Sequence, residues 1–231
     1  MRDECLICHA PLEYLENEEL MECAICHRQE YSRTRCVNGH YVCNECHMQG
    51  LDQVVEICYH LDSGDPLEIL EAMMSLPQIH MHGPEHHILV GAALLTAYYH
   101  AGGDIDLQTA IPEIFSRGKQ VPGGACGFWG ACGSAISTGM FISIVTHATP
   151  LSERSYQQAN AMTSHALSAI AKVGGPRCCK RNAYLSILTA VRYVKEHLGV
   201  YMQVHPVTCR RQAQNHQCLL TRCPFYREDE S

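Results

Sequence analysis

The chain has 231 residues, 46% of them hydrophobic, which is enough for one domain with a buried core and a smaller module. Its 17 Lys and Arg against 24 Asp and Glu give a net charge of −7, which disfavours a nucleic-acid partner. The 15 Cys and 15 His are unusual, and an odd number of cysteines cannot all pair within one chain. Because the N-terminus has no apolar segment behind a basic start, we expect a cytoplasmic protein whose cysteines bind metal or act as redox thiols.

Eight potential metal ligands lie in residues 1–47, which we assign to a zinc-binding finger module. They form four pairs with two or three residues between the members: Cys5 and Cys8, Cys23 and Cys26, Cys36 and His40, and Cys43 and Cys46. A tight turn with two residues between thiolates aims both sulfurs at one ion, so eight ligands suffice for two tetrahedral zinc sites. Because few large apolar side chains accompany them, metal binding would supply the folding free energy.

The order of these pairs allows two ways of sharing the ions. The run from Cys23 to Cys46 resembles the first six ligands of RING-type and related cross-brace fingers, with one further pair upstream. In a cross-brace, the first and third pairs hold one ion, and the second and fourth hold the other. The alternative is a zinc ribbon on the first two pairs followed by a second site. His9, His27 and His47 each follow a ligand cysteine, and we expect them to be bystanders, the alternative being that they replace a ligand or support one by a hydrogen bond.

Residues 48–200 show helical periodicity without a convincing alternating strand, which predicts an all-α bundle of about six helices. Asp65, followed by Pro66, is a strong signal for a helix start. The segment 125–146 has no charged residue, but its glycines favour a buried central helix over a transmembrane span. The predicted helical segments are a connecting helix, 48–61, followed by 66–74, 84–101, 107–117, 125–146, 152–173 and 176–198.

The first group of reactive side chains in the body lies at the start of the helix predicted from residue 84. Residues 80–87 include four His and one Glu, among them Glu85, His86 and His87. Neutral imidazole and carboxylate can bind a metal or act as a general base. A polar helix cap without further function is the alternative.

Two further groups contain cysteines. Residues 122–133 are rich in glycine and include Cys126 and Cys132, and the glycines permit close approach of the backbone to a ligand. Cys178 and Cys179 lie at a predicted helix N-terminus beside three cations, where the helix dipole and the charges favour thiolate. Adjacent buried cysteines with a packing role are the alternative for this pair.

The order of a helix, a Gly-Gly-x-Cys-Gly-x-x-Gly segment and a helix start with cysteines is distinctive. Over about residues 84–198 it resembles the redox-active family named after its C-GCAxxG-C-C motif, and a related uncharacterised family of anaerobic bacteria and archaea with a Cys-rich N-terminal finger. The resemblance implies iron–sulfur or thiol redox chemistry at Cys126, Cys132 and one or both of Cys178 and Cys179. The family's first Cys motif falls near Glu85, where this chain has His instead.

Residues 201–231 form a Cys-rich C-terminal tail that we expect to bind metal. Cys209, Cys218 and Cys223, the last followed by proline, are typical of the ligand runs of iron–sulfur proteins, although the spacing is not that of a ferredoxin. His205, His216 or a cysteine of the body could supply a fourth ligand. A zinc site and a tail without metal are the alternatives.

Two functions are compatible with these patterns. The first is an enzyme of anaerobic redox or sulfur chemistry that depends on thiolates or on a cluster such as 4Fe-4S: an oxidoreductase, a lyase or a sulfur-handling enzyme acting on a small molecule. The second is a non-catalytic zinc-finger partner, or a carrier of metal or sulfur, that docks another protein through the finger. In the enzyme, one pocket would contain Cys126, Cys132, Cys178, Cys179, Glu85, His86 and His87.

Overall fold

The computed structural model describes residues 5–227. The first regular element in this range is a two-stranded antiparallel ribbon. β1 (Leu12–Glu22) pairs with β2 (Gln29–Cys36), and a register shift between Tyr14 and Glu19 accommodates the extra length of β1. The short helix α1 (Asn44–His47) follows the ribbon. Each strand leads directly to or from a pair of potential metal ligands, so the ribbon fixes the distance between these pairs.

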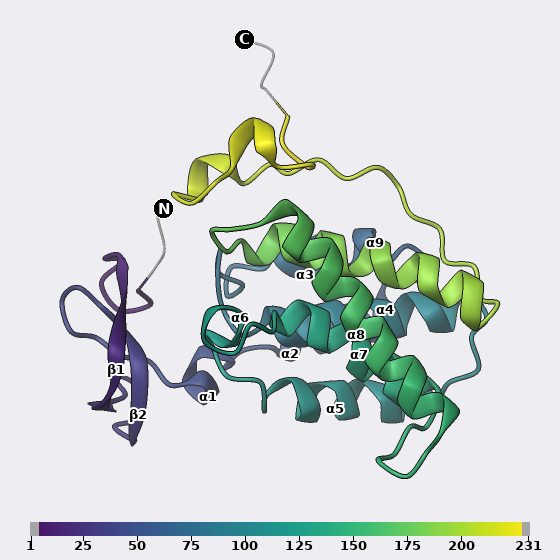
Figure 1. The fold of residues 1–231 in the computed structure, drawn as a ribbon, viewed down its shortest axis with the longest axis horizontal. Coiled ribbons are helices and arrows are strands. Elements are labelled where there is room, and N and C mark those ends of the chain that lie inside the picture. Colours follow the sequence, from purple (N-terminus) through teal and green to yellow (C-terminus); the bar gives the residue numbers. More distant parts are fainter. Residues whose placement is uncertain (1–4, 228–231) are drawn as a thin grey trace.

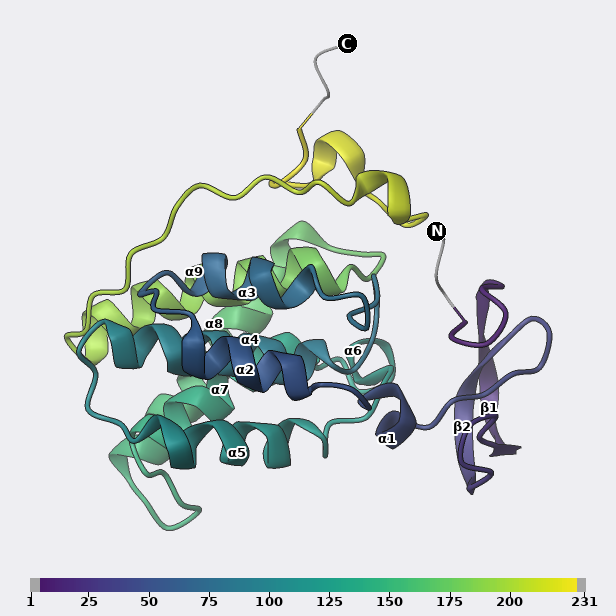
Figure 2. The same ribbon diagram turned by 180° about the vertical axis from the view of Figure 1, so that it is seen from behind.

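The remainder of the chain is mainly helical, which confirms the predicted fold class. Residues 5–227 contain nine helices, of which α1 and α6 have only four residues each. Figures 1 and 2 show the longer helices packed together as a bundle beside the ribbon. The helices after α1 are α2 (Asp52–His60), α3 (Pro66–Met74), α4 (His86–His100), α5 (Leu107–Gly118), α6 (Ala125–Phe128), α7 (Gly133–Val145), α8 (Arg154–Val173) and α9 (Cys179–His197).

α4 is the central helix of the bundle. Every residue from His86 to Tyr98 is buried, as expected for a helix that is apolar on all sides. It packs against α3, α5, α7 and α9, and α7 in turn packs closely on α8. A Cβ atom on Gly139 of α7 would lie only 1.9 Å from the hydroxyl oxygen of Thr163, so this glycine sets the distance between α7 and α8.

The predicted helix 125–146 is two helices in the structure. α6 ends at Phe128, and α7 begins at Gly133 after a turn in which Gly130 has a φ of +65°. Only glycine adopts such a backbone conformation readily, so the continuous helix was a wrong prediction for a local reason. Among the described residues, no helix has the length and apolar character needed to cross a membrane. The alternative of a transmembrane span at 125–146 is therefore not supported.

Other helix boundaries follow local capping. The Asp65 carboxylate accepts hydrogen bonds from the backbone N–H groups of Leu67, at 2.8 Å, and Glu68, at 3.4 Å, which confirms the predicted start of α3. The helices predicted from residues 48, 84 and 176 begin later, at Asp52, His86 and Cys179.

After α9 the tail turns back across the bundle, as Figure 2 shows, and contains two 3₁₀ turns, η1 (Gln212–Gln214) and η2 (Leu220–Arg222). Two polar contacts attach the tail to α3. His205 Nδ1 lies 2.6 Å from Asp65 Oδ2, and Arg211 Nη1 lies 2.9 Å from Glu71 Oε2. The cysteines of the tail are thereby placed above the N-terminal end of α9.

Candidate metal centres

The first group of potential ligands in the finger joins the first and third pairs. Cys5, Cys8, Cys36 and His40 each contribute one atom, and these four atoms lie within 4.8 Å of one another. The sulfurs of Cys8 and Cys36 are 3.7 Å apart, and His40 Nδ1 is 3.2 Å from Cys8 Sγ. Two thiolates at about 2.3 Å from a tetrahedral zinc ion would be separated by about 3.8 Å. The donor spacing therefore fits one tetrahedral ion.

The second group joins the second and fourth pairs, Cys23, Cys26, Cys43 and Cys46. The sulfurs of Cys26 and Cys43 are again 3.7 Å apart. Backbone N–H groups of Cys43 and Cys46 donate to the sulfurs of Cys23 and Cys43 at 3.4 Å. Such donors stabilise thiolate charge, and the backbone N–H groups of Cys26, Cys43 and Ile25 lower the pKa of Cys23 to about 6 although burial opposes this effect.

The structure thus interleaves the four pairs as a cross-brace requires. A zinc ribbon on the first two pairs would bring Cys5 and Cys8 next to Cys23 and Cys26, and the structure separates them into different groups. Cys and His clusters able to bind metal are therefore present in the finger, while the identity of the metal and the type of finger stay predictions. Neither His9 nor His27 belongs to either group.

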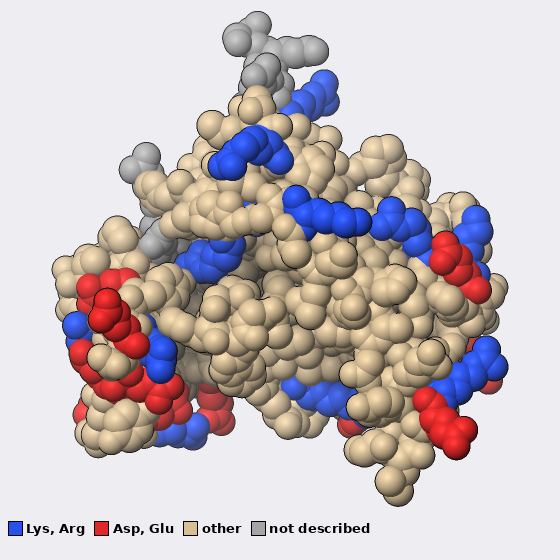
Figure 3. All heavy atoms as spheres, in the orientation of Figure 1, with Lys and Arg blue, Asp and Glu red and all other residues tan. Residues whose placement is uncertain are grey.

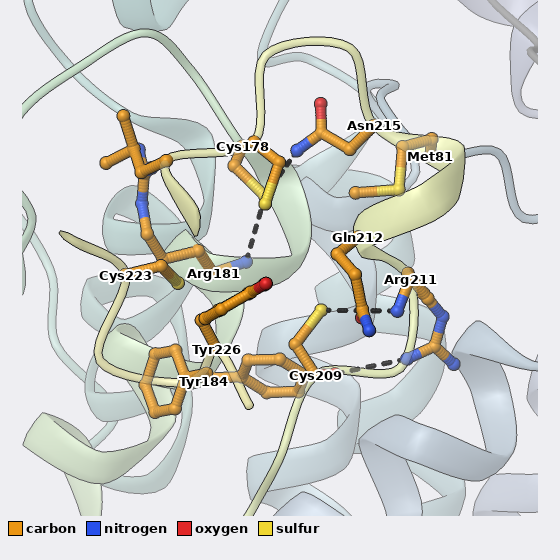
Figure 4. A pocket seen from close by; sticks show the side chains of 13 residues that line it. Met81, Cys178, Arg181, Tyr184, Cys209, Arg211, Gln212, Asn215, Cys223 and Tyr226 are labelled. Carbon is orange, nitrogen blue, oxygen red and sulfur yellow. Dashed lines mark hydrogen bonds between the residues drawn. The ribbon is translucent and has the colours of Figure 1, made fainter. Parts of the chain in front are cut away.

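A third candidate centre lies where the tail covers the start of α9. One pocket is lined by four cysteines, Cys178 from the N-cap of α9 and Cys209, Cys218 and Cys223 from the tail. Figure 4 shows Cys178 and Cys209 directed toward the space between them. Cys178 is thus the cysteine of the body that joins the tail cysteines.

Hydrogen bonds to sulfur surround this pocket. Cys178 Sγ accepts from the backbone N–H of Arg181 at 3.4 Å and from the side-chain amide of Asn215 at 3.5 Å. The sulfurs of Cys209 and Cys218 each accept from a backbone N–H at 3.4 Å. Burial raises the pKa of Cys178 and Cys209, so these thiols are neutral without a bound metal. The N–H groups are arranged to stabilise thiolates once a metal has displaced the protons.

Positive charge accompanies the same pocket. Arg181 and Arg211 line it, and residues 201–226 contain three arginines and no acidic residue. Figure 3 shows basic side chains over the tail and acidic ones gathered over the β-ribbon. These cations would offset the negative charge of four thiolates.

Cys126, Cys132 and Cys179 form a separate group on the side of the finger. Burial raises the pKa of Cys179 to about 12, which the charge of Arg177 opposes, and the charge of Cys132 acts on both Cys126 and Cys179. Arg177 Nε also donates to the hydroxyl of Tyr14 in β1 at 2.9 Å. Cys178 and Cys179, although adjacent, therefore face different surroundings. Of the four body cysteines predicted to share a pocket, Cys178 alone lines the four-cysteine pocket with the tail.

Glu85, His86 and His87 also lie outside the four-cysteine pocket. Glu85 and His86 are fully buried, and His86 Nδ1 donates to the carbonyl of Gly83 at 3.1 Å. His87 Nδ1 donates to the carbonyl of Val121 at 3.0 Å, and its ring packs against Gly133. Although burial opposes it, His47 and His86 lower the pKa of Glu85 to about 2, so this carboxylate is ionised.

Sequence reasoning missed His47 and the partners of the tail. His47 Nδ1 lies 3.2 Å from Glu85 Oε2, so His47 is no bystander. Its place directly after a ligand cysteine carried no signal that distinguished it from His9 or His27. The roles of Asn215 and Arg211 depend on the path of the tail, which no local pattern predicts.

A family model described as "Family of unknown function (DUF5714)" matches residues 54–226. The match covers the helical body and the tail and begins after the finger ligands. Comparisons with curated proteins and with solved structures gave no match. The resemblance to the C-GCAxxG-C-C family stays a prediction.

Proposed function

We propose that this chain, which belongs to the family of unknown function DUF5714, is a redox metalloprotein with an iron–sulfur cluster bound by Cys178, Cys209, Cys218 and Cys223. The proposal depends on one observation, the convergence of these four cysteines on a single pocket. Four cysteine thiolates are the usual ligand set of both 2Fe-2S and 4Fe-4S clusters. The matched family range contains all four of them.

The pocket sulfurs are spaced more widely than the ligand atoms of the finger. In the two finger groups the ligand atoms lie within 4.8 Å of one another, whereas no three of the pocket cysteines meet that condition. A cluster separates its cysteines more widely than one ion does, because the thiolates are distributed over several irons. N–H···S bonds and nearby cations are the features that stabilise a cluster and adjust its potential.

A cluster with a complete set of cysteine ligands exchanges single electrons. The separate group of Cys126, Cys132 and Cys179 would be the place for thiol chemistry on a small substrate. The finger, which we propose to hold two zinc ions, would dock the protein partner of this exchange. Exposed apolar side chains on it, among them Leu20 and Tyr31, support such a contact. The alternative, a non-catalytic carrier of metal or sulfur, uses the same docking surface without the thiol chemistry.

Metal analysis of protein purified without oxygen tests the proposal. We expect iron and acid-labile sulfide together with zinc, and a visible absorption band that dithionite bleaches. Cys178→Ser and Cys209→Ser should each lose the iron and keep the zinc. Cys58→Ser is the matched control, because Cys58 is a fully buried cysteine outside the pocket, and it should keep both metals.

The same measurement separates the two cysteine groups of the body. Cys126→Ser should keep its iron, because Cys126 does not line the four-cysteine pocket. Loss of iron from Cys126→Ser with retention in Cys209→Ser would instead favour a cluster in the glycine-rich group. Zinc without iron in the wild-type protein, even after reconstitution with iron and sulfide, would contradict the cluster.

A further inference from the structure

The contact between the finger and the helical body contains another group of potential metal ligands, separate from the two finger groups and the four-cysteine pocket. His47 is the last residue of α1, and His80 and Glu85 lie in the segment that precedes α4. One ligand atom from each lies within 4.8 Å of the other two. His47 Nδ1 is 3.2 Å from Glu85 Oε2, and His80 Nδ1 is 3.9 Å from Glu85 Oε1. Two imidazoles thus approach the two oxygens of one carboxylate.

The burial of Glu85 makes this arrangement unusual. Its side chain is 1% exposed, and those of His47 and His80 are 16% and 23% exposed. Oε1 accepts a hydrogen bond from the backbone N–H of His80 at 3.1 Å, whereas Oε2 and His47 Nδ1 face each other at 3.2 Å without the geometry of a hydrogen bond. A buried carboxylate is unfavourable unless it is paired or coordinates a metal. The two atoms without a hydrogen bond are the two that approach each other most closely.

Gly83 leaves the space in which the side chains of Glu85 and His47 approach each other. A Cβ atom on Gly83 would lie 2.0 Å from Glu85 Oε2 and 2.5 Å from His47 Cε1. No other amino acid fits at position 83 without moving the carboxylate or the imidazole. Gly83 has no positive φ that would explain a glycine by backbone conformation. Its role is therefore to admit the ligand side chains.

We propose that His47, His80 and Glu85 bind one divalent first-row transition-metal ion such as zinc. Two imidazoles and one carboxylate form an established protein ligand set for such ions. His47 belongs to the finger and the other two ligands to the body, so the ion attaches one part to the other. Other contacts join the same two parts: the Asn44 side chain accepts from Gly123 N at 3.0 Å, Arg177 contacts Tyr14, and the Phe128 ring packs against Tyr14 and Arg33. The site does not depend on the cluster proposed above.

Titration of the metal-free protein with Co²⁺ tests this site, because Co²⁺ bound by thiolates gives intense charge-transfer absorption that an imidazole and carboxylate site lacks. We expect wild type to bind one equivalent beyond those that produce the charge-transfer band. His80→Ala and Glu85→Gln should each lose one equivalent without weakening that band. His100→Ala is the control, since His100 pairs with Asp62 elsewhere in the body. Equal Co²⁺ binding by wild type and both variants would overturn the proposal.

A second measurement needs no variant and therefore does not depend on how the variants fold. The two finger groups together offer seven sulfurs and one nitrogen, from His40. X-ray absorption at the zinc edge of the wild-type protein should find additional nitrogen and oxygen ligands. If seven sulfurs and one nitrogen fully explain the zinc ligation, the proposed ion at His47, His80 and Glu85 is overturned. Iron content decides the cluster separately, so the failure of one proposal is distinguishable from the failure of the other.

Discussion

At the scale of single residues, burial separates cysteines that can react from one that cannot. Cys58 in α2 is fully buried, and burial raises the pKa of its thiol to about 12. Cys26 in the finger is exposed. Because the thiolate is the reactive form, the two residues should differ strongly toward alkylating reagents.

We predict that iodoacetamide at pH 8 leaves Cys58 unmodified in the metal-free protein, whose bundle should stay folded, while Cys26 is alkylated. At about four pH units below the pKa of Cys58, only about one thiol in ten thousand is ionised. Peptide mass spectrometry after a timed reaction gives the extent of modification. Denaturant should make Cys58 reactive, which provides the control. Equal labelling of both residues without denaturant would show that α2 is not packed as described.

A second residue-scale prediction concerns Gly133 at the start of α7. A Cβ atom there would lie 2.0 Å from Cδ2 of His87, so Gly133→Ala must displace that ring. We expect a loss of about 1–3 kcal/mol in the free energy of unfolding, as for other overpacked sites. Gly127→Ala is the control, because nothing lies within 4 Å of its Cβ position, and it should be close to neutral. Denaturant unfolding measures both, and equal stabilities would contradict the contact.

The residue scale also shows what a sequence can and cannot reveal about the sites. The finger ligands could be chosen from their spacing, because the turn between Cys5 and Cys8 is itself the device that positions two sulfurs. Cys178 could not be assigned to the tail cysteines, since only the return of the tail across α9 brings them together. The sequence favoured Cys126 as its partner, because both lie in segments that resemble one family motif. His47 and Glu85 meet through the contact between two parts of the chain, which leaves no local pattern.

At the scale of elements, capping signals predicted α3 well. Asp65 caps this helix as expected, and the tail uses the same carboxylate: its Oδ2 accepts from His205 N at 2.8 Å. The sequence did not predict the division of 125–146 into α6 and α7. An uncharged composition indicates that a segment is buried, but it does not indicate that the segment forms one continuous helix. The sequence interpretation assigned the glycines of this segment to close packing against a neighbouring helix. In α7, only Gly139 packs closely against α8.

The double role of Asp65 leads to a third prediction. Asp65→Ala should remove both the cap of α3 and one of the two polar attachments of the tail, whereas Asp106→Ala removes only the cap of α5. Loss of a cap costs about 0.5–2 kcal/mol, so Asp106→Ala should fall in that range and Asp65→Ala above it. Unfolding experiments measure the difference. Hydrogen exchange in residues 203–211 should accelerate in Asp65→Ala alone, and unchanged protection there would contradict the attachment.

At the scale of the whole molecule, the two parts are stabilised in different ways. Among the described residues, the first that belongs to the large apolar core is Met48. In the finger, the buried apolar cluster consists of the ligand cysteines Cys23, Cys43 and Cys46, with Tyr41 and Val42 packed against it. The body can therefore fold by burial of apolar surface, and the finger depends on metal.

We predict that removal of zinc by a strong chelator unfolds the finger and leaves the bundle intact. The β-ribbon from Leu12 to Cys36 should lose its hydrogen-exchange protection, because no apolar core remains to oppose the entropy of the chain. The far-UV circular dichroism of the helices should change little, since α1 is the only helix between residues 5 and 47. Added zinc should restore the protection. Loss of helical signal together with the ribbon would mean that the metal stabilises both parts as one cooperative unit.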